Sequence, residues 1–189
     1  MQARTLRINL PLTKISHDAI MPDYRRPVAH GFRIFFTVAL ANRGSCALVE
    51  NIEVLCEAAL KTRAERPFTI DAWVVLPDHL HCIWTLPAGD ADYPTRWRLI
   101  KTRFSRHLPA GPLRPSHIKR GERGIWQRRY WEHHIRDEAD FAAHLRYCWI
   151  NPVKHGFVQR LEDWPYSSVH RDIAMGRYEP GSTGQFMIP

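Results

Sequence analysis

The sequence lacks the long apolar runs and the cysteine patterns that would assign it to a membrane or to a secreted disulfide scaffold. No stretch is apolar over the length needed to cross a bilayer, and the N-terminus has no continuous apolar core of the kind found in signal peptides. The four cysteines, at positions 46, 56, 82 and 148, have no C-x-x-C spacing, which argues against a zinc knuckle and a disulfide framework. We therefore expect a protein of the reduced cytoplasm with no membrane partner.

Acidic residues are in the minority, with 19 Asp and Glu against 27 Lys and Arg, so the formal net charge is +8. A basic excess of this size favours a polyanionic partner, and nucleic acid is the leading candidate. An anionic membrane surface is the competing interpretation, but no clean basic amphipathic helix is present to bind one. The 189 residues, 44% of them apolar, suffice for one domain with a hydrophobic core.

Hydrophobic periodicity predicts an α+β fold. The expected strands cover residues 31–40, 68–76, 79–86 and 130–135, and the expected helices cover residues 49–65, 94–107 and 137–150. The first six of these elements have the order of a ferredoxin-like split β-α-β motif, an antiparallel four-stranded sheet with helices on one face. The seventh is an additional helix toward the C-terminus, for which Asp137 is the expected N-cap.

The pattern is weak at both ends of the chain. Residues 1–21 precede a second methionine, Met21, and are expected to form a loosely ordered N-terminal extension. The folded domain is expected to cover residues 22–158. Residues 159–189, punctuated by proline and glycine, are expected to form a C-terminal tail.

A histidine pair opens the third expected strand. His79 and His81 flank Leu80, and side chains two residues apart project from the same face of a strand, so the two imidazoles converge. Neutral imidazole is a common metal ligand, and a convergent pair needs only one more donor to hold an ion. The alternative is a polar pair that only forms hydrogen bonds at the end of a strand, and the residues alone do not decide between these interpretations.

The additional helix carries a second polar pair. Tyr147 and Asn151 are four residues apart and therefore lie one turn apart on one flank, with Asp140 and His144 on the same side. They could act together in a site. The alternative, which the spacing alone favours, is a tyrosine at the core boundary and an Asn151 that caps the turn before Pro152.

Three segments carry a family resemblance. They are P-D-H-L-H-C-I-W at 77–84, W-Q-R-R-Y-W-E-H-H-I-R-D-E at 126–138 and Y-C-W-I-N-P-V-K-H-G at 147–156. In this order and with these element types, the chain resembles the REP-associated tyrosine transposases of the single-tyrosine HUH superfamily. The resemblance runs from about Tyr24 to Tyr178 and makes residues 22–158 an HUH transposase domain.

The resemblance implies a specific chemistry. It makes His79, His81 and Asn151 the ligands of a divalent ion, Mg²⁺ or Mn²⁺, and Tyr147 the nucleophile. The activity would be that of a metal-dependent single-stranded DNA endonuclease and strand transferase, which acts beside REP-type hairpins through a 5′-phosphotyrosine intermediate. The alternative is a domesticated, non-catalytic protein that only binds the DNA hairpin. The partner would be single-stranded or hairpin DNA, the location the nucleoid, and the expected state a monomer, with a dimer left open.

Basic and aromatic segments are candidates for the DNA contact, because phosphates meet Arg and Lys while unpaired bases stack on aromatic rings. The candidates from residues are Arg96, Arg98, Lys101, Arg103, Arg128 and Arg129, and those from family position are Tyr24, Arg25 and Arg26. A solvated helix face is the alternative for these charges. Glu132 and His133 match the family string and are candidates for supporting the metal ligands, while the slightly favoured alternative for His133 is an ordinary sheet histidine.

Overall fold

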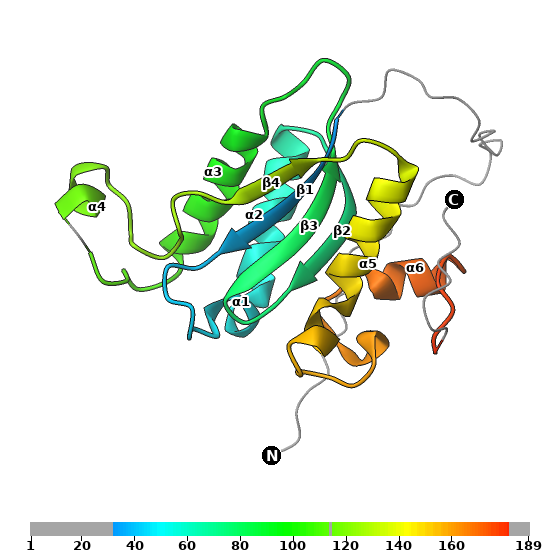
Figure 1. Ribbon diagram of the computed structural model, residues 1–189. Helices are drawn as coiled ribbons and strands as arrows, with labels where there is room; N and C mark the ends of the chain where they lie inside the picture. Colours follow the sequence, from blue (N-terminus) through cyan, green and yellow to red (C-terminus); the bar gives the residue numbers. More distant parts are fainter. Residues whose placement is uncertain (1–31, 114, 182–189) are drawn as a thin grey trace.

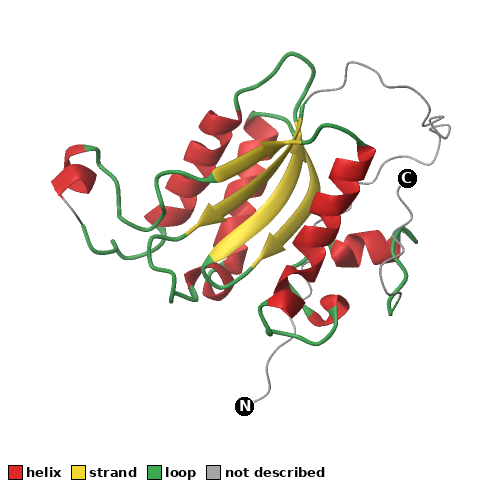
Figure 2. Ribbon diagram, in the orientation of Figure 1, coloured by secondary structure: helices red, strands yellow, loops and turns green. Residues whose placement is uncertain are grey.

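The computed structural model describes residues 32–113 and 115–181 and contains one antiparallel sheet of four strands in the order β2-β3-β1-β4 (Figures 1 and 2). The strands are β1 (Arg33–Ala39), β2 (Thr69–Val75), β3 (His79–Thr85) and β4 (Trp131–His134). All three neighbouring pairs are antiparallel, as the sequence predicts. The predicted α+β class with a four-stranded antiparallel sheet is thus confirmed.

Helices cover both faces of this sheet (Figure 1). The helical segments are α1 (Ala47–Glu50), α2 (Ile52–Glu65), α3 (Tyr93–Arg106), α4 (Pro115–Lys119), α5 (Glu138–Lys154), the 3₁₀ turn η1 (Leu161–Asp163) and α6 (Val169–Ala174). The helices α2 and α3 pack on one face, and α5 packs on the other. Because the sheet separates two apolar cores, a side chain's parity along a strand decides which helix it meets.

Strand β3 shows this division most clearly. Leu80, Cys82 and Trp84 are buried under α2 and α3, whereas Ile83 is buried with the apolar stripe of α5. Trp84 stacks on Trp97 of α3 with ring centroids 4.3 Å apart. The two histidines have the parity of Ile83 and therefore face α5.

Helix α5 begins as predicted and ends later than predicted. The Asp137 carboxylate accepts a hydrogen bond from the backbone N–H of Asp140 at 2.8 Å, which caps the first turn. The expected end at residue 150 is wrong, because the helix continues through Pro152 to Lys154. Proline removes one backbone donor without stopping this helix. Gly156, at φ 73°, adopts the left-handed conformation that commonly follows a helix end.

Two further segments differ from what the hydrophobic periodicity predicts. The expected single helix over residues 49–65 is two helices, α1 and α2, which meet at Asn51 with φ −120° and ψ 38°. The long basic loop after α3 contains the short helix α4.

Residues 166–168 cover the outer edge of β2. The backbone N–H of Val75 donates to the Tyr166 carbonyl at 2.9 Å, and that of Ser168 donates to the Trp73 carbonyl at 2.7 Å. Val169 is buried in the same core as α5. These contacts hold η1 and α6 against the domain. Among the described residues, no helix has both the length and the apolar character needed to cross a bilayer.

Candidate functional site

The histidine pair lies buried between the sheet and α5. His79 is 5% exposed and His81 2%, and their ring centroids are 5.0 Å apart. Each ring has an oxygen partner at Nδ1: the Asp78 carboxylate lies 2.6 Å from that atom of His79, and the Thr37 hydroxyl lies 2.9 Å from that of His81. Oxygen partners of this kind fix a metal-binding imidazole's orientation and leave Nε2 available.

Both imidazoles are neutral near neutral pH. Burial lowers the pKa of His79, against a smaller raising effect of the Asp78 carboxylate. Burial, together with the neighbouring His79, lowers the pKa of His81 to about 3. A neutral ring keeps the lone pair that a metal requires.

Asn151 completes a set of three polar side chains. It is fully buried, and neither its amide oxygen nor its amide nitrogen has a hydrogen-bond partner. Nε2 of His81 is buried without a well-aligned partner as well, and a looser polar interaction with the Asn151 amide raises the pKa of that ring against the larger effect of burial. The capping role considered for Asn151 is wrong, because its side chain forms no such bond. Buried groups of this kind are rare, and a bound ion is one of their explanations.

Tyr147 is next to this set. Its ring centroid is 5.1 Å from that of His81 and 5.8 Å from that of Phe35, while 39% of the residue remains exposed. The predicted juxtaposition of Tyr147 with the two imidazoles is therefore present within one chain. The phenol lies where a substrate from solvent can reach it.

Two residues that sequence reasoning missed also belong to this region. Lys154 places its ammonium 5.4 Å from the centroid of the Tyr147 ring, and His155 lies 5.3 Å from the ring of His79. They follow Tyr147 by seven and eight positions and so lie on the helix side that carries Asn151. Extending the helical spacing by one turn past Pro152 would have found them.

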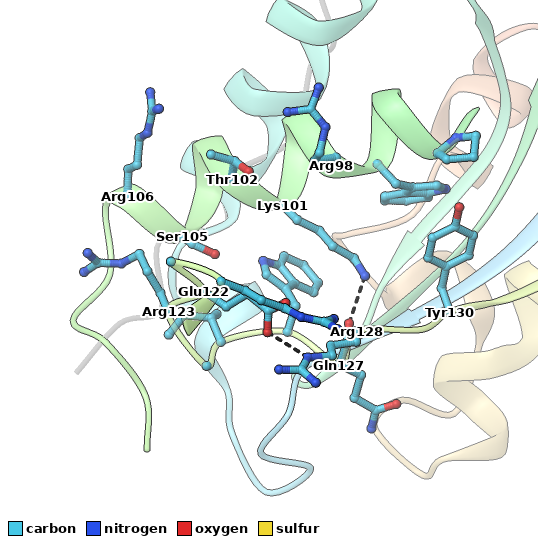
Figure 3. Close-up of a pocket in the computed structure, with 17 residues that line it drawn as sticks. Arg98, Lys101, Thr102, Ser105, Arg106, Glu122, Arg123, Gln127, Arg128 and Tyr130 are labelled. Carbon is cyan, nitrogen blue, oxygen red and sulfur yellow. Dashed lines mark hydrogen bonds and ion pairs between the residues drawn. The ribbon is translucent and has the colours of Figure 1, made fainter. Parts of the chain in front are cut away.

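A basic cleft lies on the opposite side of the sheet, between α3 and the segment 120–130 (Figure 3). Its volume is about 790 Å³. The cations that line it are Arg98, Lys101, Arg106, Arg120, Arg123 and Arg128. Lys101 donates to the Gln127 carbonyl at 3.0 Å and lies 5.1 Å from the Tyr130 ring centroid. Burial lowers the pKa of Lys101 to about 8.

Two of the predicted DNA contacts have intramolecular partners instead. Arg96 is 1% exposed, and its guanidinium donates to both oxygens of Asp90, at 2.6 and 3.0 Å, and to the Pro67 carbonyl at 2.9 Å. This burial contradicts a role for Arg96 in DNA contact. Arg103 is turned toward α2, where it meets Glu65 at 2.5 Å. Both belong to the packing of α3 against its neighbours.

Lys101 is half-buried in the cleft, and the other described basic candidates are exposed. Arg98, Arg128 and Arg129 face solvent, and Arg128 pairs with Glu122 at 2.8 Å. Their contact with DNA stays a prediction. Tyr24, Arg25 and Arg26 lie outside the described residues.

Glu132 and His133 do not touch the histidine pair. Glu132 accepts a hydrogen bond from the Tyr93 hydroxyl at 2.9 Å, on the α3 side of the sheet, so it cannot support ligands on the other side. His133 faces α5, where its Nε2 lies 2.9 Å from an Asp140 oxygen. A supporting role of His133 toward the His79 and His81 rings is not seen.

Known proteins resemble the chain along most of its length. No family model matches it. A REP-associated tyrosine transposase of Escherichia coli (strain K12) is 48% identical over 158 residues, which are 84% of this chain and 88% of the relative. The chain therefore belongs to the REP-associated tyrosine transposase family. A relative of Haemophilus influenzae, named for the same family, is 44% identical over 155 residues, covering 81% of this chain and 88% of the relative.

A solved structure of the REP-associated tyrosine transposase family supports this placement. The structure of such a transposase bound to a REP hairpin has a TM-score of 0.71 and 45% identity, and the match covers 89% of this chain and 94% of that one. The three resembling segments identified in the sequence thus reflect membership in the REP-associated tyrosine transposase family.

Proposed function

We propose that this chain is a metal-dependent enzyme that nicks and rejoins single-stranded DNA beside REP-type hairpins. The observation that carries the proposal is the set of unpaired buried atoms, Nε2 of His81 and the amide of Asn151, next to the ring of Tyr147. A partly exposed phenol beside two imidazoles and an amide is an arrangement that suits metal-assisted phosphoryl transfer. Transposase relatives over most of the chain support the same reaction class.

His79, His81 and Asn151 would hold the ion. Two imidazole nitrogens and an amide oxygen suit Mn²⁺ and tolerate Mg²⁺, and three protein ligands leave positions for phosphate oxygens. When bound, the ion would polarise the scissile phosphoryl group.

Tyr147 would perform the covalent step. Its Oη forms a bond to the phosphorus, the bond from phosphorus to the 3′ oxygen breaks, and the 3′ oxygen leaves as a hydroxyl after it takes up a proton. The phenol proton is released in the same exchange, so the charge balances. The product is a 5′-phosphotyrosine and a free 3′-hydroxyl. Attack by another 3′-hydroxyl reverses the step and joins the strand, because the phosphotyrosine conserves the bond.

The DNA would be held partly by the basic cleft. Arg98, Lys101 and Arg128 offer cations for phosphates, and the family neighbour's hairpin complex supports hairpin DNA as the partner. On the α5 side, Trp131 of the edge strand is 54% exposed, which leaves its ring available to an unpaired base. The side chains of the proposed active site meet within one chain, so a monomer would suffice for the proposed reaction.

The test is adduct formation on an oligonucleotide that carries a hairpin with single-stranded flanks. The wild-type chain should form a denaturation-resistant, 5′-linked adduct with Mn²⁺ or Mg²⁺ and none in chelator. Tyr147→Phe should abolish the adduct while the hairpin still binds. Tyr166→Phe is the matched control, because this tyrosine has no amide one turn away, and it should react like the wild type.

An adduct that persists in Tyr147→Phe removes Tyr147 from the mechanism. Tight hairpin binding by the wild type without an adduct in any metal would instead favour the second candidate, a non-catalytic hairpin-binding protein.

A further inference from the structure

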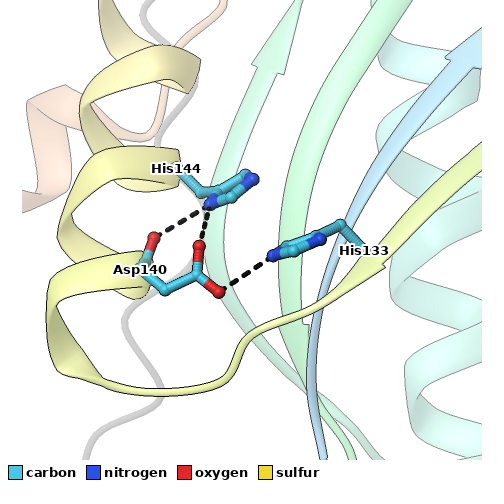
Figure 4. A group of neighbouring side chains, drawn as sticks. All are labelled: His133, Asp140 and His144. Atoms are coloured by element: carbon cyan, nitrogen blue, oxygen red, sulfur yellow. Dashed lines mark hydrogen bonds and ion pairs between the residues drawn. The ribbon is translucent and has the colours of Figure 1, made fainter.

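A second polar cluster lies between β4 and α5, apart from the proposed active site (Figure 4). The carboxylate of Asp140 lies between two imidazoles. Nε2 of His133 is 2.9 Å from Oδ2, and Nδ1 of His144 is 3.1 Å from Oδ1. The two rings are nearly parallel, at 14°, with centroids 4.5 Å apart. One possible ligand atom of each of the three side chains lies within 4.8 Å of those of the other two.

The spacing of these atoms fits a first-row transition ion. Zn²⁺ holds imidazole nitrogen and carboxylate oxygen at about 2.0–2.2 Å, so neighbouring ligand atoms of a tetrahedral site are about 3.3 Å apart. Each imidazole nitrogen is already close to that separation from one carboxylate oxygen of Asp140, His133 at 2.9 Å from Oδ2 and His144 at 3.1 Å from Oδ1. Asp140 is buried, whereas His133 and His144 are partly exposed, which leaves the fourth position open to water. Two imidazoles with one carboxylate are a donor set that suits zinc better than magnesium.

Neighbouring groups compete for the same atoms. Arg136 donates from Nε to Oδ2 of Asp140 at 3.0 Å, and Nδ1 of His144 lies 2.9 Å from the Asp140 carbonyl. The Arg136 side chain is 75% exposed, so its guanidinium can turn into solvent when another cation binds Asp140, while the backbone N–H of Arg136 still donates to Oδ2 at 3.1 Å. The alternative to a metal is a closed network of hydrogen bonds around Asp140.

We propose that His133, Asp140 and His144 bind a divalent transition ion of the zinc class, at a site separate from the one assigned to His79, His81 and Asn151. The ion links the short edge strand β4 to the helix that carries Tyr147, one turn beyond His144. Its role is to hold that helix in position. The proposal does not depend on the strand-transfer reaction, since it concerns binding alone.

The test measures how many zinc ions each full chain binds, with Zn²⁺ as the probe and a chromophoric chelator as the competitor. The background variant carries His79→Ala and His81→Ala, which removes the other histidine pair. This background should retain about one tightly bound zinc per chain. Adding His133→Asn should remove it. Adding His134→Asn should not, because this neighbouring histidine lies on the other side of β4, against Phe32 and Tyr93.

A second variant and a second measurement keep the test decisive. His144→Asn removes a donor from the other element and should also lose the zinc, whether or not His133→Asn folds. Zinc should raise the melting temperature of the background and of its His134→Asn derivative but not that of the His144→Asn derivative. Unchanged zinc content in both donor variants, or no tight zinc in the background, overturns the proposal in favour of a network of hydrogen bonds alone.

Discussion

Asn151 places a polar amide in the interior with neither of its polar atoms hydrogen-bonded. Burying an unpaired amide destabilises a folded protein by about 1–3 kcal/mol. A side chain of that kind in the last turn of α5 therefore serves something other than folding. In the proposed function the missing partner is the metal, which makes Asn151 a residue where stability and activity oppose each other.

Asn151→Leu tests this opposition, because leucine has nearly the shape of asparagine without its polar atoms. In chelator the variant should be more stable than the wild type by about 1–2 kcal/mol, since an unsatisfied buried amide is removed. Denaturant unfolding measures the stability, and the hairpin oligonucleotide assay should show no adduct.

Asn51→Leu is the matched control for that prediction. The Asn51 amide donates to the Ala47 carbonyl at 2.9 Å, so its loss should destabilise the chain and leave adduct formation intact. A destabilised Asn151→Leu, or one that still forms the adduct, would contradict the role assigned to this amide.

At the scale of single residues, the sequence predicted positions correctly where the regular geometry of a strand or helix fixes them. The alternation of a strand put His79 and His81 on one face, and the helical repeat put Tyr147 beside Asn151. The prediction that Arg96 contacts DNA was wrong for a physical reason. Its position on α3 follows from the sequence, but its partners Asp90 and Pro67 lie in loops whose paths no periodicity specifies.

Helix α3 presents two arginines, two positions apart, that face different surroundings. Arg96 is fully enclosed between the loop at Pro67 and the carboxylate of Asp90, whereas Arg98 lines the open cleft. Positions two apart on a helix lie about 200° apart around its axis. One arginine of α3 can therefore pack in the interior while the other lines the surface cleft.

Leucine substitutions at these positions should separate the two roles. Arg96→Leu should destabilise the fold by about 3 kcal/mol, because it leaves the Asp90 carboxylate and the loop carbonyls without their donor. Arg98→Leu should leave stability within about 0.5 kcal/mol of the wild type and weaken hairpin binding at low salt. Denaturant unfolding and a binding titration measure the two effects. Equal loss of DNA affinity in both variants, with equal stability, would place Arg96 at the surface after all.

At the scale of elements, the sequence predicted the order and type of each strand and long helix within residues 32–113 and 115–181. The errors lie at ends and in connections. Pro152 suggested an end that α5 does not have, because a single missing backbone donor in the last turn does not outweigh the packing of that helix on the sheet. The same error hid Lys154 and His155.

In the molecule as a whole, the sheet separates the basic cleft from the proposed active site. The basic cleft lies against α3, on one side, and the proposed active site lies against α5, on the other. The sequence could not predict this separation, because the basic segments and the site residues alternate along the chain. A net charge of +8 predicts that DNA is bound, but only the packed structure shows which cations form one surface.

The pH dependence of DNA binding tests whether the basic cleft contacts DNA independently of the proposed active site. Burial lowers the pKa of Lys101 from 10.5 to about 8 in the free protein, so this side chain loses its charge as the pH rises from 7 to 9. If Lys101 contacts a phosphate only when charged, hairpin affinity should fall over that window by up to about tenfold. The pKa of Lys101 is lower in the folded chain than in the unfolded chain, so its titration makes folding more favourable as the pH rises from about 8 toward 10.5. A loss of affinity at high pH therefore cannot be attributed to unfolding caused by this group.

Lys101→Arg is the matched variant, because a guanidinium stays charged throughout this range. Its hairpin affinity should change much less between pH 7 and 9, while other groups that titrate there contribute equally to both proteins. The rate of adduct formation, measured on DNA-saturated protein at one pH, should be the same in both, because the proposed active site lies across the sheet from Lys101. Parallel pH profiles for binding would remove Lys101 from the DNA contact, and a changed rate in saturated complexes would show that cleft and active site are not independent.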